Sequence, residues 1–429
     1  MQCCDSYRAM TRRGLLKASS AAGIATLLSM SIRNLVTYAG TDRKAQCDHV
    51  ILLWMSGGMS HLDTFDPKPD KIGITGEFKP IKTTCDGIDL TEILPGIAGQ
   101  MKHAAVVRSL AGVEGDHGRA TYNVLTSYRM TPQLVHPSLG SVLVSQLEKQ
   151  GDLPTFVSIS GRALSAGYLG QACEAYYVGS AGAPDPYVKL PEGISDVRQQ
   201  KRLEVLEQMN RKFETGAGAA TGRDDYDATK ASYAAARKFM NSPALKAFDI
   251  NLEKPETRAA YGDTPFGRGC LLARRLVEEG VRFVQVNLGG FDTHGNNFPT
   301  MRRLGATIDP AISALIADLA ANGKLDRTMV LLMSEFGRTP TINGGAGRDH
   351  HPGCFSALMA GGGIRKGFLY GASDDEGRKP KEHAVTVGDI HATVCRAMGI
   401  DHEITVPTPL GRPMRLVDEG KPIKELLQT

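Results

Sequence analysis

Six short runs of apolar residues recur between residues 49 and 361, and segments with apolar residues at helical spacing separate several of them. One such segment is 264–280, where Leu271, Leu272 and Leu276 fall on one side of a helix and Gly280 supplies a C-terminal stop. Uninterrupted apolar strands separated by helices are typical of a mostly parallel sheet covered on both faces. We therefore predict an α/β fold with a doubly wound, mostly parallel sheet, built from strands at 49–55, 104–110, 155–160, 281–288, 328–335 and 354–361.

Residues 193–262 carry no strand pattern. They begin with a charged amphipathic helix, continue through the small-residue linker TGAGAATGRDD at 215–225 and end in an Ala-rich helical stretch. We interpret them as a helical insertion or lid beside the sheet, and two ordinary crossover helices joined by a long loop are an equally good interpretation. The main domain is predicted to span residues 47–429 and to include this insertion.

The first forty residues follow a different pattern. Arg12 and Arg13 precede Leu and Lys, and the moderately apolar stretch ASSAAGIATLLSMSI follows at 18–32. This stretch is shorter than the about 20 apolar residues of a membrane-spanning helix, but it suits an export signal. The pattern is similar to a twin-arginine signal, so we predict that residues 1–40 direct export through the twin-arginine translocation machinery to the periplasm or cell envelope. An uncleaved anchor and an ordinary basic amphipathic helix are the alternatives, and no transmembrane segment is expected beyond the signal.

Composition excludes some classes of function. The chain of 429 residues has a net charge of only +4, and no Lys/Arg run outside the N-terminus is long enough to grip a phosphate backbone, so we expect no nucleic-acid partner. The eight cysteines include no Cys-x-x-Cys pair, which argues against a structural zinc site or a dithiol redox centre. We expect mostly buried thiols.

Polar segments follow four of the predicted strands: SGGMSHLD, AGVEGDHGRAT, GGFDTHGNN and SEFGRTP, the last followed by GRDHHPG. Because ligands of an open α/β sheet bind beyond the carboxyl ends of its strands, we expect these segments to meet in one site. Taken singly, each residue is weak evidence, and convergence of the four segments is what favours a metal site. The candidate metal ligands are His61, Asp63, Asp292, His294, Glu335, Asp349 and His351.

Two of these positions carry a specific argument. Glu335 ends an apolar strand, where an unpaired buried carboxylate is costly and needs a metal cation or an arginine such as Arg338. The segment from Asp349 to His351 offers three successive ligands, of which backbone geometry lets at most two face one ion, and we assign Asp349 and His351 to it.

A mixed set of histidines and carboxylates favours a divalent ion such as Zn²⁺ or Mn²⁺, with Ca²⁺ or Mg²⁺, which prefer all-oxygen shells, as alternatives. Arg119, Arg338 and Arg348 lie in the same segments and are able to hold an anionic group in bidentate fashion. A metal ion with arginines is typical of a site for phosphate or sulfate esters.

The same segments belong to longer motifs, WMSGGMSHLDTFDPKP, GDHGRATYNVLTS, YGDTPFGRGCLLARRLVEEGVRFVQVNLGGFDTHGNN, SEFGRTPTINGGAGRDHHPG and VTVGDIHATVCRAMGID. Together they resemble the family called domain of unknown function 1501, over nearly the whole mature chain. That family is regarded as a branch of the alkaline phosphatase and sulfatase superfamily. The resemblance therefore implies an alkaline phosphatase-like fold.

The functional residues of that superfamily carry over only in part. Its hydrolases typically end the first strand with a metal-binding Asp, where this chain has Ser56. Their nucleophile usually opens the helix after the second strand, where this chain has His117, with Thr121 one helical turn later. A formylglycine sulfatase signature, Cys-x-Pro/Ala-x-Arg, does not occur. Asp292 and His294 resemble the strand-end ligands, and the candidate catalytic residues are His117, Arg119, Thr121 and Arg338.

Three hypotheses follow. The first is an exported, sulfatase- or phosphatase-like hydrolase that uses a divalent metal ion to cleave sulfate or phosphate esters of a small molecule or polysaccharide. In it His117 is a nucleophile or general acid/base, and the arginines hold the anion. The second is a non-catalytic relative that binds glycans or cell-envelope partners, and the third treats the histidines as satisfied polar groups of the core.

Overall fold

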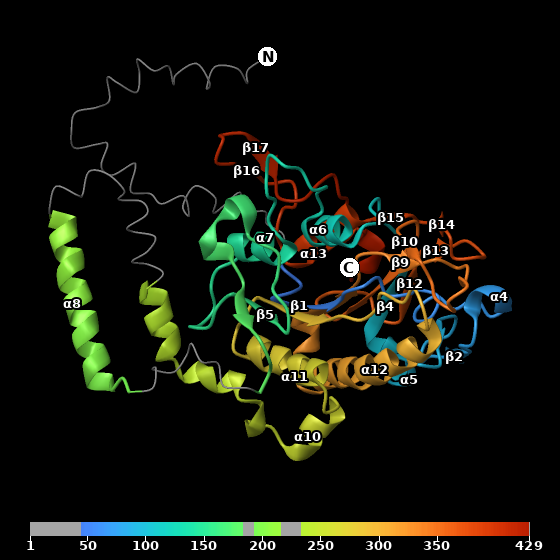
Figure 1. Ribbon diagram of the computed structural model, residues 1–429, viewed down its shortest axis with the longest axis horizontal. Helices are drawn as coiled ribbons and strands as arrows, with labels where there is room; N and C mark the ends of the chain where they lie inside the picture. The colour runs from blue at the N-terminus through green and yellow to red at the C-terminus, as the bar shows by residue number, and fades with distance from the viewer. Residues whose placement is uncertain (1–43, 183–192, 216–232, 429) are drawn as a thin grey trace, which may run out of the picture. The chain divides into compact units, whose positions relative to one another are not determined.

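A nine-stranded sheet forms the centre of the computed structural model (Figure 1), which describes residues 44–182, 193–215 and 233–428. The strands run in the order β12-β4-β11-β8-β1-β7-β5-β6, with β15 beside β4. Their bounds are β1 His49–Met55, β4 Ala104–Ala111, β5 Phe156–Ile159, β6 Tyr176–Val178, β7 Phe283–Leu288, β8 Thr328–Met333, β11 Phe355–Ala360, β12 Phe368–Tyr370 and β15 Val385–Thr386.

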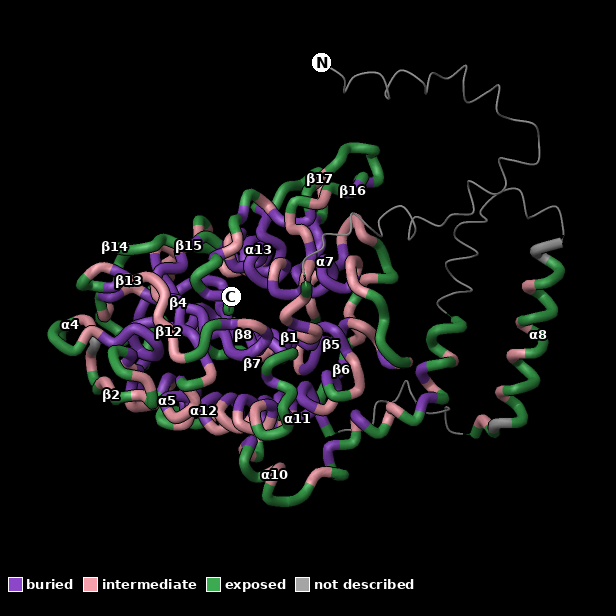
Figure 2. Tube along the Cα trace, turned by 180° about the vertical axis from the view of Figure 1, so that it is seen from behind, coloured by how far each residue is buried: buried purple, intermediate pink, exposed green. Residues whose placement is uncertain are grey.

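All pairings in this sheet are parallel except those of β11, which runs antiparallel to both β4 and β8. The central strands have continuous apolar sequences because helices bury both faces, and Figure 2 shows them as buried. All six predicted strands are therefore confirmed, to within a few residues at their ends.

Helices cover the two faces of the sheet in separate layers (Figures 1 and 2). One layer contains α5 (Pro95–Gln100), α11 (Pro265–Glu278) and α12 (Asn297–Ala321), and the other contains α6 (His117–Thr126), α7 (Leu139–Gln146) and α13 (Val387–Ala397). The doubly wound α/β fold is thus confirmed. Helix α11 begins where Thr264 accepts a hydrogen bond from the backbone N–H of Gly267, with Pro265 at the first helical position.

Helix α12 is long and apolar enough to cross a membrane, the one such helix among the described residues. Its apolar positions, including Met301, Ile308 and Leu315, are buried in the core that it shares with α11 and α5. Packing of this kind explains its apolar sequence as that of a core helix.

The described parts of 193–262 contain helical elements only: α8 (Asp196–Thr215), a helix at 233–240, η5 (Pro243–Phe248), η6 (Ile250–Leu252) and α10 (Pro255–Ala260). The bounds of the predicted insertion stay a prediction, since the linker at 216–232 lies outside the described residues, as does the predicted export signal at 1–40. The described cysteines are all free thiols, and Cys47, Cys270, Cys354 and Cys395 are buried, as predicted.

The remaining elements are short. They are α4 Ile72–Thr75, the hairpin strands β2 Pro80–Lys82 and β3 Asp89–Thr91, β9 Gly337–Arg338 and β10 His350–His351, β13 Ala372–Ser373 and β14 Pro380–Glu382, β16 Thr405–Pro407 and β17 Pro413–Arg415, and the 3₁₀ turns η1 Met101–His103, η2 Gly167–Leu169, η3 Gln171–Cys173, η7 Leu325–Arg327 and η8 Lys424–Leu426. Of these, the pair β9 and β10 matters most for the site, because it joins the end of β8 to the start of β11.

The carboxyl ends of the parallel strands lie level with one another. Met55 of β1 is opposite Leu288 of β7, and Trp54 is opposite Met333 of β8. Because β11 is antiparallel, the segment that precedes it reaches this same edge, where the backbone N–H of Gly112 bonds the carbonyl of Pro352 at 2.8 Å. The four segments that the sequence singles out therefore meet at one edge.

Candidate metal centre

Four side chains with metal-binding atoms come together at this edge, and we call them the open cluster: His117, Asp292, His294 and His350. One ligand atom each of His117, Asp292 and His350 lies within 4.8 Å of the other two. His117 is the first residue of α6 after β4, and His350 is the first residue of β10 before β11. Asp292 and His294 belong to the loop that follows β7.

The loop after β1 fixes the position of Asp292. Gly57 has a φ of 115°, which favours glycine, and a Cβ there would lie 2.5 Å from the backbone N of Asp292. The Gly57–Gly58 turn therefore lets the loops after β1 and β7 pack backbone against backbone.

The Nε2 atoms of the three histidines surround the carboxylate of Asp292. His117 Nε2 is 3.3 Å from Oδ2, while His294 Nε2 and His350 Nε2 are 3.2 and 3.3 Å from Oδ1. The two Nε2 atoms of His294 and His350 are 2.9 Å apart. Between a quarter and a half of each of these side chains is exposed, so the open cluster is reachable from solvent.

The other ring nitrogen of each imidazole, Nδ1, donates a hydrogen bond to an oxygen that the protein holds in place. The acceptors are Glu335 Oε1 for His117 at 2.8 Å, Asp349 Oδ1 for His294 at 2.8 Å and the carbonyl of Gly115 for His350 at 2.7 Å. A carbonyl and two carboxylates accept only, so each Nδ1 carries a proton, and in the neutral form of the ring the lone pair is on Nε2. Hydrogen bonding of this kind is how metal-binding histidines are oriented in proteins.

The Nε2 atoms of the open cluster differ in their partners, because those of His294 and His350 lie within hydrogen-bond distance of each other at 2.9 Å. His117 Nε2 is shielded from solvent and has no hydrogen-bond partner in the described part of the chain, although Asp292 Oδ2 is near. With bonds of about 2.1 Å, neighbouring ligands of a tetrahedral ion lie about 3.4 Å apart, close to the separations measured here. The residues present therefore fit a divalent cation of the Zn²⁺ or Mn²⁺ type.

Arg338 holds Asp292 in its ionised form. Its Nη2 donates to Oδ1 of Asp292 at 2.6 Å. Burial alone would raise the pKa of Asp292, but the hydrogen bond and charge of Arg338, with His117 and His350 nearby, lower it to about 2. A hydrogen bond from His294 likewise lowers the pKa of Asp349.

Glu335 is almost fully buried behind the open cluster, with 1% of its side chain exposed. Its Oε1 accepts from the backbone N–H of Gly57 at 2.7 Å as well as from His117, and its Oε2 accepts from Ser334 Oγ at 3.2 Å. The structure thus places Glu335 as the residue that orients His117, and not as a direct ligand of the metal. The sequence analysis names Arg338 as the alternative partner of Glu335, but Arg338 forms an ion pair with Asp292.

The arginines expected to hold a substrate anion differ in position. Each nitrogen of Arg338 donates inside the protein, to the carbonyls of Gly57, Gly58 and Arg348 and to Asp292, and its side chain is fully buried, so it positions a carboxylate and is shielded from a substrate. Arg348 is also fully buried. Arg119 is 62% exposed and is ion-paired with Glu114 and Asp116 beside His117, and Thr121 lies half-buried one turn further along α6.

Besides Glu335 and Asp349, three more predicted ligands lie outside the open cluster, and with Arg348 we call them the closed cluster: His61, Asp63 and His351. Asp63 forms a bidentate ion pair with Arg348, at 2.9 and 3.0 Å, and accepts from Asn297 at 2.9 Å. His61 donates to the carbonyl of Gly377 at 2.8 Å and His351 to that of Arg378 at 2.6 Å. Burial lowers the pKa of His61 to about 4. Protein partners occupy both carboxylate oxygens of Asp63 and the Nε2 atoms of His61 and His351, while the buried Nδ1 of His61 has no hydrogen-bond partner among the described residues.

The sequence analysis assigns His351 and not His350 to the metal, and the geometry of strand β10 reverses this choice. Both residues lie in the extended strand β10, where successive side chains point to opposite sides. His350 faces the open cluster, so His351 turns away and lies 6.3 Å from the ring of His61. Recognising GRDHH as a strand would have restricted the choice to one of the two histidines.

No curated protein matches this chain. Solved structures with partial similarity include Ps i-CgsB (12% identity, 83% of this chain and 73% of that chain, TM-score 0.41), the lipoteichoic acid synthase LtaP from Listeria monocytogenes (10%, 83% and 73%, 0.37) and the phosphonate monoester hydrolase SpPMH from Silicibacter pomeroyi (11%, 89% and 76%, 0.35). These TM-scores are too low to support an argument about function, and the fold stands on the sheet topology described above. The family model described as "Protein of unknown function (DUF1501)" matches residues 47–427, and the chain belongs to this family.

Proposed function

We propose that this chain is an exported hydrolase that uses one divalent metal ion, held by the open cluster, to cleave sulfate or phosphate esters. The observation that carries the proposal is the arrangement of three imidazole Nε2 atoms around one ionised carboxylate, with every Nδ1 already used. His117, Asp292 and His350 are the proposed ligands, with His294 as the fourth.

When bound at such a site, a Zn²⁺- or Mn²⁺-type ion polarises an ester oxygen and lowers the pKa of water. The chain's own groups hold the ligands in their reactive forms. Glu335 keeps the Nδ1 proton on His117, and Arg338 keeps Asp292 ionised. We assign His117 to the metal and not to nucleophilic attack, because its Nδ1 donates to Glu335 and its Nε2 faces the carboxylate of Asp292 within the open cluster.

Arg119 is the proposed contact for the anionic part of the substrate. It extends from the first turn of α6, two residues after His117, and most of its side chain is exposed. Thr121 is the remaining hydroxyl of the candidate set and lies in the same helix. The proposed substrates are anionic esters of small molecules or polysaccharides.

Metal analysis of the purified protein, combined with turnover of aryl sulfates, aryl phosphates and sulfated polysaccharides, tests this function. We expect about one Zn²⁺ or Mn²⁺ per chain and an activity that disappears with a chelator and returns with the metal. Substoichiometric metal under all loading conditions would overturn the site, and full metal without any ester turnover would overturn the reaction.

Export is the second part of the proposal and rests on Arg12 and Arg13 with the apolar stretch at 18–32. Changing both arginines to Lys should retain the chain in the cytoplasm, as measured by cell fractionation, because twin-arginine export reads the guanidinium pair. Unchanged fractionation of that variant would exclude this route.

A non-catalytic role in binding glycans or cell-envelope partners is the second candidate. The burial of Arg338 and Arg348 favours it, because two of the three guanidinium groups expected to hold a substrate anion are used inside the protein. Under this alternative a His117→Ala variant keeps its polysaccharide binding and has no activity to lose. Loss of a measurable esterase activity in that variant would exclude it.

A further inference from the structure

A second hollow lies at the same edge of the sheet, beyond the end of strand β6. In the sheet β6 is two strands away from β7, which precedes Asp292, or about 10 Å across. The cavity has a volume of about 550 Å³. Its walls come from the turn after β6, from η6, from α10 and the turn after it, and from the start of α11; no residue of the open cluster lines it.

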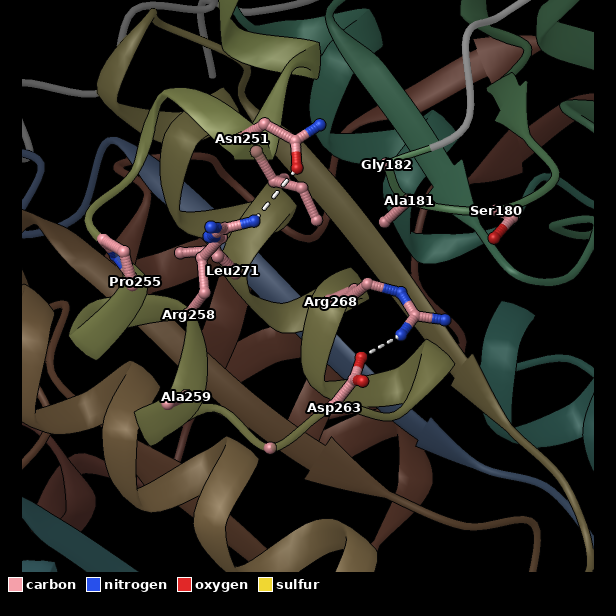
Figure 3. A pocket seen from close by; sticks show the side chains of 12 residues that line it. Ser180, Ala181, Gly182, Asn251, Pro255, Arg258, Ala259, Asp263, Arg268 and Leu271 are labelled. Carbon is pink, nitrogen blue, oxygen red and sulfur yellow. Dashed lines mark hydrogen bonds and ion pairs between the residues drawn. The ribbon is translucent and has the colours of Figure 1, made fainter.

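Two arginines form opposite parts of the wall (Figure 3). Arg258 is hydrogen-bonded to the side-chain oxygen of Asn251 at 3.0 Å, and Arg268 is ion-paired with Asp263 at 2.5 Å. Arg258 has no carboxylate partner among the described residues, and its Nε is shielded from solvent without a hydrogen-bond partner there. A buried donor of this kind is uncommon and calls for an explanation.

The charge balance of the wall is positive. Arg258 and Arg268 face the single carboxylate of Asp263, whose side chain is 95% exposed and therefore easily displaced toward solvent. Arg268 also lies near the start of α11, the end at which a helix dipole favours a negative charge. The pocket is thus suited to one anionic group, which guanidinium donors bind in bidentate fashion.

The floor of the pocket is apolar. Ile250, Leu271 and Ala181 line it and are each almost fully buried, at 3%, 1% and 3% exposed. The apolar lining that stays open is Pro255 and Ala259, both exposed, which an inorganic anion would leave uncovered and the body of an organic anion would cover. Small-molecule sites commonly combine such an apolar lining with a few polar groups.

We propose that this pocket binds a small organic anion, whose sulfate, phosphate or carboxylate group is held by Arg258 and Arg268 and whose body covers Pro255 and Ala259. The site is independent of the open cluster, because the two share no residue and lie on different strands. A test of this site is therefore independent of a test of the hydrolase function.

The test is a titration of the full chain with phenyl phosphate, phenyl sulfate and benzoate, and with inorganic phosphate and sulfate, followed by saturation-transfer NMR and calorimetry. We expect saturable binding of at least one of the three aromatic anions, tighter than that of the inorganic ions. Arg258→Gln should raise the dissociation constant about tenfold, the loss typical of one charge-assisted contact. Asp263→Asn should lower it, because Arg268 is then free for the ligand.

The control is Arg302→Gln on α12, an exposed arginine that is ion-paired with Glu77 and Glu92 away from the pocket. It should leave the affinity unchanged, and thermal unfolding should show all three variants folded. Absence of saturable binding of every probe, or equal affinity in the wild type and in Arg258→Gln, would overturn the proposal. Binding that is lost with a chelator and is insensitive to Arg258→Gln would place the anion at the metal centre, which overturns this site and leaves the proposed function intact.

Discussion

The open and closed clusters contain the same types of residue at the same edge of the sheet, yet they differ in what surrounds each group. In the closed cluster Asp63 has Arg348 as a bidentate partner, and neither side chain is exposed. In the open cluster Arg338 is the one arginine or lysine among the described residues that pairs with Asp292, and three imidazole Nε2 atoms lie within 3.3 Å of the same carboxylate. We therefore expect a histidine or aspartate of a strand-end motif to act as a ligand where its free atom lies beside other potential ligand atoms, as in the open cluster, whereas the free Nδ1 of His61 belongs to no such group among the described residues.

The difference also separates stability from metal binding. A buried ion pair whose groups complete each other contributes to the folded state, and breaking one partner leaves an uncompensated charge. A group of lone pairs that face one another costs stability until a cation occupies them. Substitutions in the two clusters should accordingly affect different measurements.

The largest effect is expected for Asp63→Ala in the closed cluster. Arg348 would remain fully buried without its acid, which typically costs about 3–5 kcal/mol of the free energy of unfolding. Urea denaturation measures this loss, and metal content of the folded fraction should not change. A variant of wild-type stability that has lost its metal would show that Asp63 is a ligand after all and would erase the distinction between the clusters.

A pH titration of stability sharpens the same comparison. His61 is neutral when folded because burial lowers its pKa to about 4, while an unfolded His titrates near 6.5. Between these values the unfolded chain binds the extra proton, so stability falls as the pH drops from about 6.5 to about 4, by on the order of 3 kcal/mol. His61→Gln, which keeps a donor for the carbonyl of Gly377, should flatten the curve by that amount.

His391 in α13 is the matched case, since burial lowers its pKa to about 4 as well and it lies in a different helix layer. His391→Gln should flatten the profile by a similar amount, and the two changes should add because the sites share no partner. Denaturation series run with chelator in every sample exclude a contribution from metal release. An unaltered slope in both variants would refute the assignment of neutral, buried histidines.

The neighbouring histidines of β10 give a direct comparison within one strand. His350→Ala should weaken metal binding more than about a hundredfold, because it removes a direct ligand, whereas outer-shell changes typically cost 10–100-fold. His351→Ala should leave the metal affinity nearly unchanged, since its ring bonds Arg378 on the other side of the strand. Competition with a chromogenic chelator measures both constants. The opposite ranking would restore the sequence-based choice of His351.

The sequence was sufficient for the sheet and for the edge at which the site lies. Continuous apolar runs such as 328–333 mark buried parallel strands, and the polar segments after them meet at the carboxyl edge through topology alone. The loop after β7 with Asp292 and His294 was located at this edge in this way, because the two residues follow the end of β7 by only four and six positions.

Which buried polar groups pair with each other could not be predicted from the sequence. Nothing local indicates that Asp63 pairs with Arg348, which is 285 residues away, or that Arg338 uses all its nitrogens inside the protein. Such pairs depend on how loops from β1, β8 and β9 fold over one another. The antiparallel direction of β11 could not be predicted from the sequence either, although this direction is what brings His350 to the edge.

The smallest effect should come from the groups that orient the ligands. Glu335→Gln removes the charge that accepts the Nδ1 proton of His117 while it keeps the size of the side chain, so metal affinity should fall about 10–100-fold. Asp349→Asn makes the corresponding change behind His294, but this carboxylate is 56% exposed and water can replace it, so the loss should be only a few-fold. Chelator competition on both variants, with wild-type unfolding curves as the check on folding, measures the difference. Equal losses would mean that burial of the orienting carboxylate has no influence on the metal, and the contrast between enclosed and exposed partners would then fail inside the open cluster itself.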